Sequence, residues 1–244
     1  HVTDLMDKLL DAYRPVAEKE VAEIEQLARE KEGEDFVLQP WDFSHYGYLL
    51  KMQRYNIDSE MLRPYLQLEK VQEGVFGLAT RLYGITFERA TDIPVYHPDV
   101  VAYRVKDADG SFLAVLLADF HPRANKQSGA WMTTYREQWV EDKTGENVRP
   151  IVSIVMNFTK PTKERPALLT LGEVETFLHE FGHALHAIFS QVRYEALSCT
   201  NVYWDFVELP SQFMENYATE AEFLNTFARH YQTGEPMPEE LIRR

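Results

Sequence analysis

The sequence has 244 residues, of which 45% are hydrophobic and 26% are charged, so it can bury a core in one or two domains. Its formal net charge of −14 argues against nucleic-acid binding, because proteins that bind nucleic acids usually present a basic face. No apolar run reaches the roughly eighteen residues that a membrane-spanning helix needs, so we expect no membrane association.

The chain contains a single cysteine, Cys199, which excludes an internal disulfide framework and favours a reducing compartment. Its surroundings, EALSCTN, contain no neighbouring histidine or basic pair, so we interpret Cys199 as structural rather than as a reactive thiol. We therefore expect a cytoplasmic location. Because the chain lacks a starting methionine and stops where a helix begins, we expect a piece of a longer protein, and a periplasmic location stays open.

The first third of the chain has the periodicity of helices. Apolar residues spaced by three and four over residues 1–31 predict one amphipathic helix, which Gly33 and the following QPW end. A second helix is predicted in SHYGYLLKMQRYNID, with Ser44 as its N-cap. A third is predicted in PYLQLEKVQEGVFGLATRLYG, ending at Gly84. The aromatic and leucine positions of these helices are interpreted as core.

After residue 95 the pattern changes to that of strands. DVVAYRV and SFLAVLLADF are rich in β-forming residues and are separated by KDADG, which is typical of a hairpin turn. RPIVSIVMNFTKP predicts one more strand between prolines. The polar segment between these runs, residues 121–148, is predicted to be a loop with short elements.

From Gly172 the pattern is helical again. GEVETFLHEFGHALHAIFSQ is apolar nearly all round, which predicts a buried helix. WDFVELPSQFMENYATEAEF predicts a further helical region with Pro210 near its start, and FLNTFARHYQTGEPMP a last helix that stops at Gly234. The whole pattern predicts a mainly α fold with a small β-sheet (α+β), in three successive parts: helical residues 1–90, sheet and loops 91–171, and helices 172–244.

The motif HEFGH inside the buried helix predicts a metal site. His179 and His183 are four residues apart, so they lie on one helical face, where a divalent metal can bind one nitrogen of each at about 2.1 Å. Glu180 lies at the flank of the pair, where it can accept a proton from a metal-bound water. A chance match has a probability on the order of a few per cent. The alternative, a core helix with unpaired polar groups, costs roughly 1–3 kcal/mol for each group.

The metal site also needs a third protein ligand from another element, which leaves one position for water. WDFVELPSQ offers Asp205 and Glu208, and Glu208 is preferred because it starts the helical part, where the direction of the side chain is fixed. His186 is interpreted as a hydrogen-bonded core histidine rather than as a residue that supports the metal or the substrate. Four polar residues are candidates to orient an imidazole, with a solvated or capping role equally open: Glu175, Asp205, Gln212 and Glu215. Four histidines without ligand spacing are interpreted as structural: His45, His97, His121 and His230.

FLHEFGHALH and DFVELPSQFMENYA, with their separation, resemble the thimet oligopeptidase-like zinc peptidases. ADFHPRANKQSGAW, MNFTKPTKERPALLT and ARHYQTGEPMPEEL extend the resemblance over most of residues 45–244. It implies the zincin-like catalytic core of a helical oligopeptidase, with one Zn²⁺ held by His179, His183 and Glu208 and with Glu180 as general base. RPALLT and RYEALSCTNVYWDFVELPSQ look closest to the peptidyl-dipeptidase branch, which removes carboxyl-terminal dipeptides, with oligopeptidase A next.

The resemblance also implies that residues 1–244 are a fragment of one catalytic domain that acts on short peptides and is monomeric at full length. The small sheet would line a narrow channel, with ADFHPRANKQSGAW as a wall along which a peptide is held by strand addition. The family's downstream loop, with a histidine and tyrosines that stabilise the oxyanion, has no counterpart in this sequence. Since the loss of oxyanion donors typically costs ~10²–10³ in rate, we expect weak zinc binding or slow turnover from this piece alone.

Two other classes of function stay open. One is a non-enzymatic scaffold or peptide-binding module with a structural or vestigial metal site, although such a site would favour four protein ligands and has no use for Glu180. The other is an iron or manganese hydrolase, since two histidines and one carboxylate can also hold iron. The sequence also leaves open whether a peptidase would act as a dipeptidase or as an endopeptidase.

Overall fold

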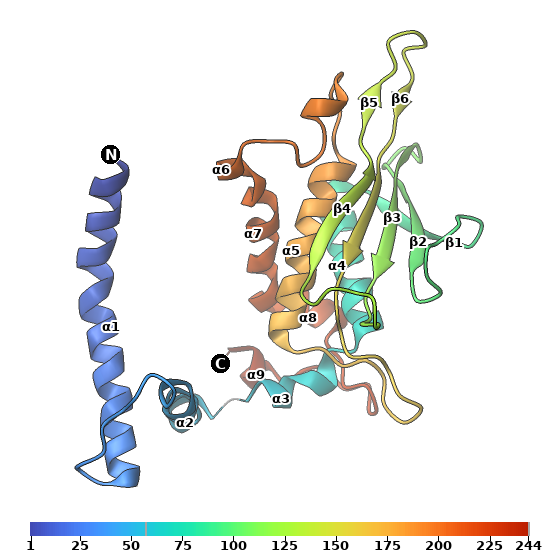
Figure 1. Cartoon of the computed structure of the whole chain (residues 1–244). Helices are drawn as coiled ribbons and strands as arrows, with labels where there is room; N and C mark the ends of the chain where they lie inside the picture. Colours follow the sequence, from blue (N-terminus) through green and yellow to red (C-terminus); the bar gives the residue numbers. More distant parts are fainter. Residues whose placement is uncertain (57, 244) are drawn as a thin grey trace. The chain divides into compact units, whose positions relative to one another are not determined.

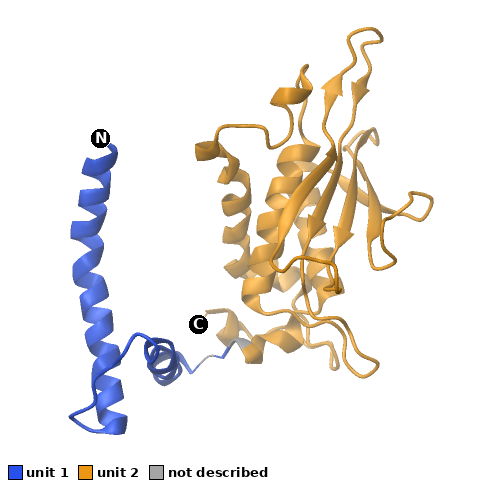
Figure 2. Ribbon diagram, viewed as in Figure 1, with its two compact units in different colours: residues 1–58, 244 blue, residues 59–243 orange. Residues whose placement is uncertain are grey.

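The computed structural model describes residues 1–56 and 58–243, which divide into two compact units, residues 1–58 and residues 59–243 (Figure 2). The smaller unit contains two helices, α1 (Val2–Glu32) and α2 (Phe43–Tyr55), close to the predicted ranges. They pack together through Ile24, Ala28 and Tyr46. The apolar stripe of α1 is thus buried only toward the carboxyl end of the helix.

Ser44 was predicted to be the N-cap of α2, and this prediction is wrong. The helix begins at Phe43, and its first hydrogen bonds run to the main-chain oxygen of Asp42, which accepts the N–H groups of His45 and Tyr46 at 3.0 and 3.2 Å. Asp42 therefore occupies the N-cap position. Ser44 is the second residue of the helix, so its hydroxyl does not occupy the capping position.

The larger unit contains a five-stranded sheet, a two-stranded ribbon and the remaining helices (Figure 1). The strands are β1 (Thr86–Ala90), β2 (Val101–Lys106), β3 (Phe112–Asp119), β4 (Trp131–Arg136), β5 (Trp139–Val140), β6 (Asn147–Val148) and β7 (Ile151–Val155). The helices are α3 (Ser59–Leu62), α4 (Leu68–Tyr83), α5 (Leu171–Ile188), α6 (Trp204–Val207), α7 (Leu209–Glu215), α8 (Ala221–Phe227) and α9 (Glu239–Arg243). The mainly α architecture with a small sheet is as predicted. No helix among these described elements is both long and apolar enough to cross a membrane.

The sheet has the order β1-β2-β3-β7-β4. The predicted hairpin joins β2 to β3, and β3 pairs in parallel with β7. β4 pairs antiparallel with β7, with Trp131 opposite Val155, and forms one edge of the sheet. This order places β4 at an edge where its outer side has no partner strand among the described residues.

The core lies between one face of the sheet and the helices α4 and α5. Side chains such as Leu116 and Ile154 from the sheet are buried together with Val75 from α4 and Phe177 and Phe181 from α5. α5 contacts β3, β4 and β7 and also packs against α7 (Figure 1). The helix that carries the HEFGH motif is therefore held between the sheet and a second helix.

The structure differs from the predicted elements in three places. β1 lies within residues 1–90, which were expected to be helical, because its five residues pair in full register with β2. β4 lies in the segment expected to be a loop with short elements. It forms a strand because its backbone pairs with β7, and its mixed sequence alone does not predict this pairing. The last predicted helix ends at Phe227 rather than at Gly234, since Arg229 forms a β-bridge with Pro236.

Candidate metal centre

The HEFGH motif lies in α5, whose start is fixed by a capping box. The Thr170 hydroxyl accepts the N–H of Glu173 at 3.1 Å, and the Glu173 carboxylate accepts the N–H of Thr170 at 2.7 Å. The other end of α5 meets a buried guanidinium, because Arg149 donates to the main-chain oxygens of Ile188 and Ser190 at 2.7 and 2.9 Å. A positive group there complements both the free carbonyls and the helix dipole.

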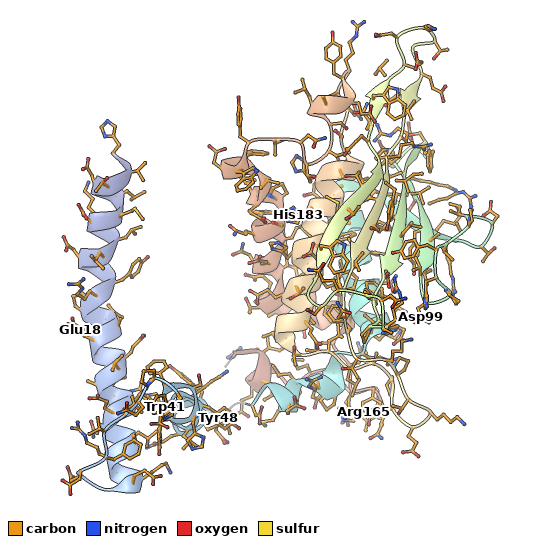
Figure 3. The ribbon with its side chains drawn as sticks, viewed as in Figure 1. Glu18, Trp41, Tyr48, Asp99, Arg165 and His183 are labelled. Carbon is orange, nitrogen blue, oxygen red and sulfur yellow. The ribbon has the colours of Figure 1, made fainter. Side chains whose placement is uncertain are left out.

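His179 and His183 lie on one face of α5, as the spacing predicts. Their rings are 4.8 Å apart, edge to face, and their side chains are 26% and 12% exposed. Figure 3 labels His183 in the carboxyl-terminal half of α5, beside α7. Burial lowers the pKa of His183, which favours the neutral imidazole that a metal requires.

Glu208 reaches this pair from the junction of α6 and α7. It occupies the N-cap position of α7, with Pro210 in the first turn, as expected for a proline in a helix. The Ser211 hydroxyl donates to Glu208 Oε2 at 2.7 Å, and this bond, followed by the neighbouring histidines, lowers the pKa of Glu208. The carboxylate is therefore ionised near neutral pH.

A glycine lets the two helices approach closely enough for these three residues to meet. A Cβ atom on Gly182 would lie 2.6 Å from the main-chain oxygen of Pro210 and 2.6 Å from Cα of Ser211. The backbone of α7 therefore crosses α5 at Gly182, directly beside His183 and directly after Glu208. The sequence analysis did not single out Gly182, although a glycine inside a buried helix is a signal of close packing.

The donor atoms of the three residues converge. Glu208 Oε2 lies 3.4 Å from His179 Nε2 and 3.1 Å from His183 Nε2, and one donor atom from each residue fits within 4.8 Å of the others. Tetrahedral zinc with bonds of about 2.0–2.2 Å separates its ligand atoms by about 3.3–3.6 Å. Three such atoms that leave one coordination position free match a hydrolytic site better than a four-ligand structural one.

Glu215 orients one of the imidazoles. Its Oε1 lies 2.5 Å from His179 Nδ1, so the ring presents Nε2 to the other two donors. Of the candidates for this role, Asp205, Glu175 and Gln212 are exposed and lie outside the metal-binding group. His183 Nδ1 is buried without a hydrogen-bond partner among the described residues.

Glu180 is only 6% exposed, although glutamate side chains are charged at neutral pH in most proteins and are rarely buried. Burial raises its pKa from 4.5 to about 7, while His179 lowers the pKa and Glu208 raises it by smaller amounts. A carboxyl with a pKa near the working pH can both accept and release a proton.

Glu180 lines a cavity of about 360 Å³ together with the three candidate ligands and residues of three other segments: Ala130, Trp131, Met132, Thr200 and Val207. Met132, Thr200 and Val207 were not predicted to line the site, although Thr200 and Val207 lie in the segment RYEALSCTNVYWDFVELPSQ and Val207 directly precedes Glu208.

The remaining residues of interest lie outside this cavity. His186 Nδ1 has no hydrogen-bond partner among the described residues, so the predicted hydrogen-bonded core histidine is not found, and its ring instead contacts that of Phe206. Cys199 is buried, and burial raises its pKa to about 11, which fits the predicted unreactive thiol. The four histidines interpreted as structural each have a local contact: His45 with Tyr46, His97 with Asp99, His121 with Phe158 and His230 with Tyr65.

A mixed α/β unit that brings HEFGH and a distant glutamate to one cavity is the arrangement of a metallohydrolase site. Comparison with known proteins agrees: the model of peptidase family M3 matches residues 1–244, and the chain belongs to this family. Dipeptidyl carboxypeptidase of Escherichia coli strain K12 is 41% identical over 239 residues, which are 98% of this chain and 34% of that protein.

Two further relatives show the breadth of the match. Oligopeptidase A of the same Escherichia coli strain is 39% identical over 242 residues, 99% of this chain and 35% of that protein. The mitochondrial intermediate peptidase of Arabidopsis thaliana is 34% identical over 244 residues, 99% of this chain and 34% of that protein. The chain thus spans about a third of the length of the curated relatives that it matches.

Proposed function

We propose that this chain carries the metal-binding part of the active site of a zinc peptidase that hydrolyses peptide bonds in short peptides. The observation that carries the proposal is the convergence of the His179, His183 and Glu208 donor atoms beside a buried glutamate. Membership of peptidase family M3 supports the same activity. The proposal assigns one Zn²⁺ per chain to these three residues.

When bound, zinc supplies Lewis-acid chemistry, which polarises a carbonyl and acidifies water. Glu180 lines the same cavity, where its carboxylate takes a proton from the attacking water and passes it to the leaving amine. Its raised pKa suits both transfers. Glu215 holds the His179 ring by Nδ1, so that Nε2 keeps its orientation during the reaction.

The edge strand β4 is proposed to hold the peptide. Ala130, Trp131 and Met132, at the start of β4 or just before it, line the cavity that contains Glu180. An exposed edge strand can add a peptide as a further strand through main-chain hydrogen bonds. This arrangement would place the peptide backbone alongside the candidate metal ligands.

We propose release of carboxyl-terminal dipeptides as the mode of action, with internal cleavage of short peptides as the alternative. Dipeptidyl carboxypeptidase at 41% identity supports the first mode, and oligopeptidase A at 39% supports the second. The products of a ten-residue peptide cut by the full-length protein decide between them. Stepwise loss of carboxyl-terminal pairs is expected, whereas internal cuts would select the alternative.

The buried, free Cys199 supports a reducing compartment, so we propose a cytoplasmic location. We also propose that the full-length protein is a monomer, which size-exclusion chromatography with light scattering tests directly.

The glutamate variant Glu180→Gln tests the proposed chemistry. In the full-length protein, this change is expected to keep zinc, because Glu180 is not a ligand, and to remove nearly all peptide hydrolysis, because the amide accepts no proton. Zinc is measured by elemental analysis and cleavage with a fluorogenic peptide. The matched control is Glu175→Gln, an exposed glutamate of the same helix, which is expected to cleave normally. Near-normal cleavage by Glu180→Gln would defeat the assignment.

A further inference from the structure

Lys126 lies in the loop between β3 and β4, yet its side chain is only 2% exposed. Its Nζ donates to the main-chain oxygens of Asp119 and His121 at 3.0 and 2.9 Å, to Asp119 Oδ1 at 3.0 Å, and to the main-chain oxygen of Met156. A buried ammonium is strongly unfavourable unless it is paired and hydrogen-bonded. The loop therefore folds around this one cation.

The countercharge is Asp119, which is fully buried at the end of β3. Arg123 donates two hydrogen bonds of 2.9 Å to its carboxylate, and the Tyr96 hydroxyl donates a third of 3.0 Å. Burial alone would raise the pKa of Asp119, but the bonds from Arg123, Lys126 and Tyr96 outweigh it, so the pKa is lowered. We call Asp119, Arg123, Lys126 and Tyr96 the Lys126 cluster. Burial lowers the pKa of Lys126, while its hydrogen bond and charge pairing with Asp119 act to raise that pKa, and the Asp119 carboxylate stays ionised around neutral pH.

The loop leads from the Lys126 cluster directly to the wall of the metal cavity. Beyond Lys126, the Asn157 side-chain amide donates to the main-chain oxygens of Gln127 and Gly129 at 2.9 and 2.7 Å. Gly129 has a φ of +94°, which turns the chain into β4. Lys126 thus joins the end of β3 to the end of β7 immediately before Ala130 and Trp131, which line the cavity.

We propose that Lys126 is a positioning residue for peptide binding: its ammonium holds the loop of residues 120–130 so that β4 presents its free edge beside the metal centre. Lys126 does not contact the peptide, because its side chain is enclosed by main-chain oxygens. The inference rests on the proposed peptidase function. It adds that the affinity for peptide depends on an internal cation outside the cavity.

The variant Lys126→Met in the full-length protein tests this role. Loss of the ammonium leaves main-chain oxygens of the loop without their donor, so the loop that leads into β4 loses an anchor and the start of β4 becomes less fixed, although the strand stays paired with β7. The Michaelis constant for a fluorogenic peptide is expected to rise about tenfold, with kcat within about twofold of the wild type, since the metal centre lies on other elements. Amide hydrogen exchange is expected to become faster in residues 127–132 and to stay unchanged in α5.

Two further variants complete the experiment. Asn157→Ala removes the second anchor of the same loop at a partly exposed position, so it is expected to fold and to raise the Michaelis constant about threefold. The matched control is Lys70→Met, which removes a lysine of α4 whose surface ion pair with Glu73 lies outside this loop, and it is expected to behave as the wild type.

The outcomes separate this inference from the proposed function. If the wild type does not cleave peptides, the peptidase proposal fails, and hydrogen exchange alone then tests whether Lys126 holds the loop. If the wild type cleaves and Lys126→Met leaves the Michaelis constant unchanged, the positioning role is overturned, whatever the loss of stability. If Lys126→Met does not fold, Asn157→Ala decides, and an unchanged Michaelis constant for that variant overturns the role.

Discussion

Asp119 is a single residue on which two cations depend, the buried Lys126 and the partly exposed Arg123. Its carboxylate accepts hydrogen bonds from Arg123, Lys126 and Tyr96, and its own side chain is 1% exposed. A buried ion pair adds little net stability when complete, but the removal of one partner leaves an uncompensated charge. The free energy of unfolding should therefore be sensitive to this carboxylate, which lies at the end of β3 and next to the loop that leads to β4.

The variant Asp119→Asn is expected to lower the free energy of unfolding by about 3–5 kcal/mol at pH 7, because it leaves Lys126 and Arg123 without an anion. The pKa of Asp119 is lowered by folding, so its contribution is fully present above the ordinary carboxyl range near pH 4. It is lost as the pH falls through the lower pKa of the folded state. Urea denaturation of both proteins should show the difference shrinking in acid.

Asp142→Asn is the control for this experiment, since Asp142 pairs with Arg193 at the surface, where both side chains are mostly exposed. It is expected to unfold almost like the wild type. A difference between Asp119→Asn and the wild type that persists unchanged at pH 2 would contradict the assignment of the stabilisation to the ionised carboxylate.

At the scale of elements, the candidate metal centre depends on the crossing of α5 and α7. Neither helix contains all the donors: His179 and His183 come from α5, and Glu208 precedes α7. The two backbones touch at Gly182, where no side chain separates them. The spacing of the donor atoms is therefore set by helix packing.

The variant Gly182→Ala is expected to push α7 away from α5, because the new methyl group would lie 2.6 Å from backbone atoms that cannot rotate aside. We expect a loss of about 1–3 kcal/mol in the free energy of unfolding. We also expect zinc affinity to fall at least about tenfold, as it does when ligand-supporting contacts are lost. Competition with a chromophoric chelator measures the affinity.

Gly77→Ala in α4 is the matched control, because a Cβ atom there would meet nothing within 4 Å. Alanine favours the helix, so this variant should bind zinc normally and be as stable as the wild type or more so. Unchanged zinc affinity in Gly182→Ala would show that the helix crossing does not set the ligand geometry.

At the scale of the whole molecule, the proposed zinc would link two separate helical segments of the chain, α5 and the start of α7. Zinc that binds only the folded state stabilises it by about 2.7 kcal/mol at a free concentration one hundred times its Kd. We therefore expect the thermal midpoint of the chelator-treated protein to rise when zinc is restored. Differential scanning fluorimetry with and without zinc measures the shift.

His183→Ala is expected to abolish this zinc-dependent shift, since one of the three donors is lost. His97→Ala, which removes a histidine outside the group, should keep it. An equal rise in both variants would mean that zinc binds elsewhere on the protein.

Several features of the molecule could be predicted from local patterns alone. The pairing of His179 with His183, the buried character of α5 and the hairpin of β2 and β3 follow from helical or strand periodicity, which depends only on near neighbours. β1 and β4 could not be predicted in this way, because their hydrogen-bond partners lie elsewhere in the chain and their own residues, TFERA and WMTTYR, mix polar and apolar side chains without a clear alternation. The predicted end of the last helix was wrong for a related reason. Arg229 and Pro236 form a β-bridge, so the helical hydrogen bonds stop before Gly234.

By itself, the sequence determined which residues form the candidate metal centre: two histidines on one helical face, a glutamate beside them and a carboxylate at the start of a later helix. Only the tertiary structure decided that Glu215 orients His179, that Gly182 sets the approach of α7, and that Lys126 is buried in a loop beside the cavity. The physical reason is the distance along the chain over which each property acts. Side-chain identity and helical period are local properties, whereas packing, desolvation and ion pairing depend on which distant segments meet.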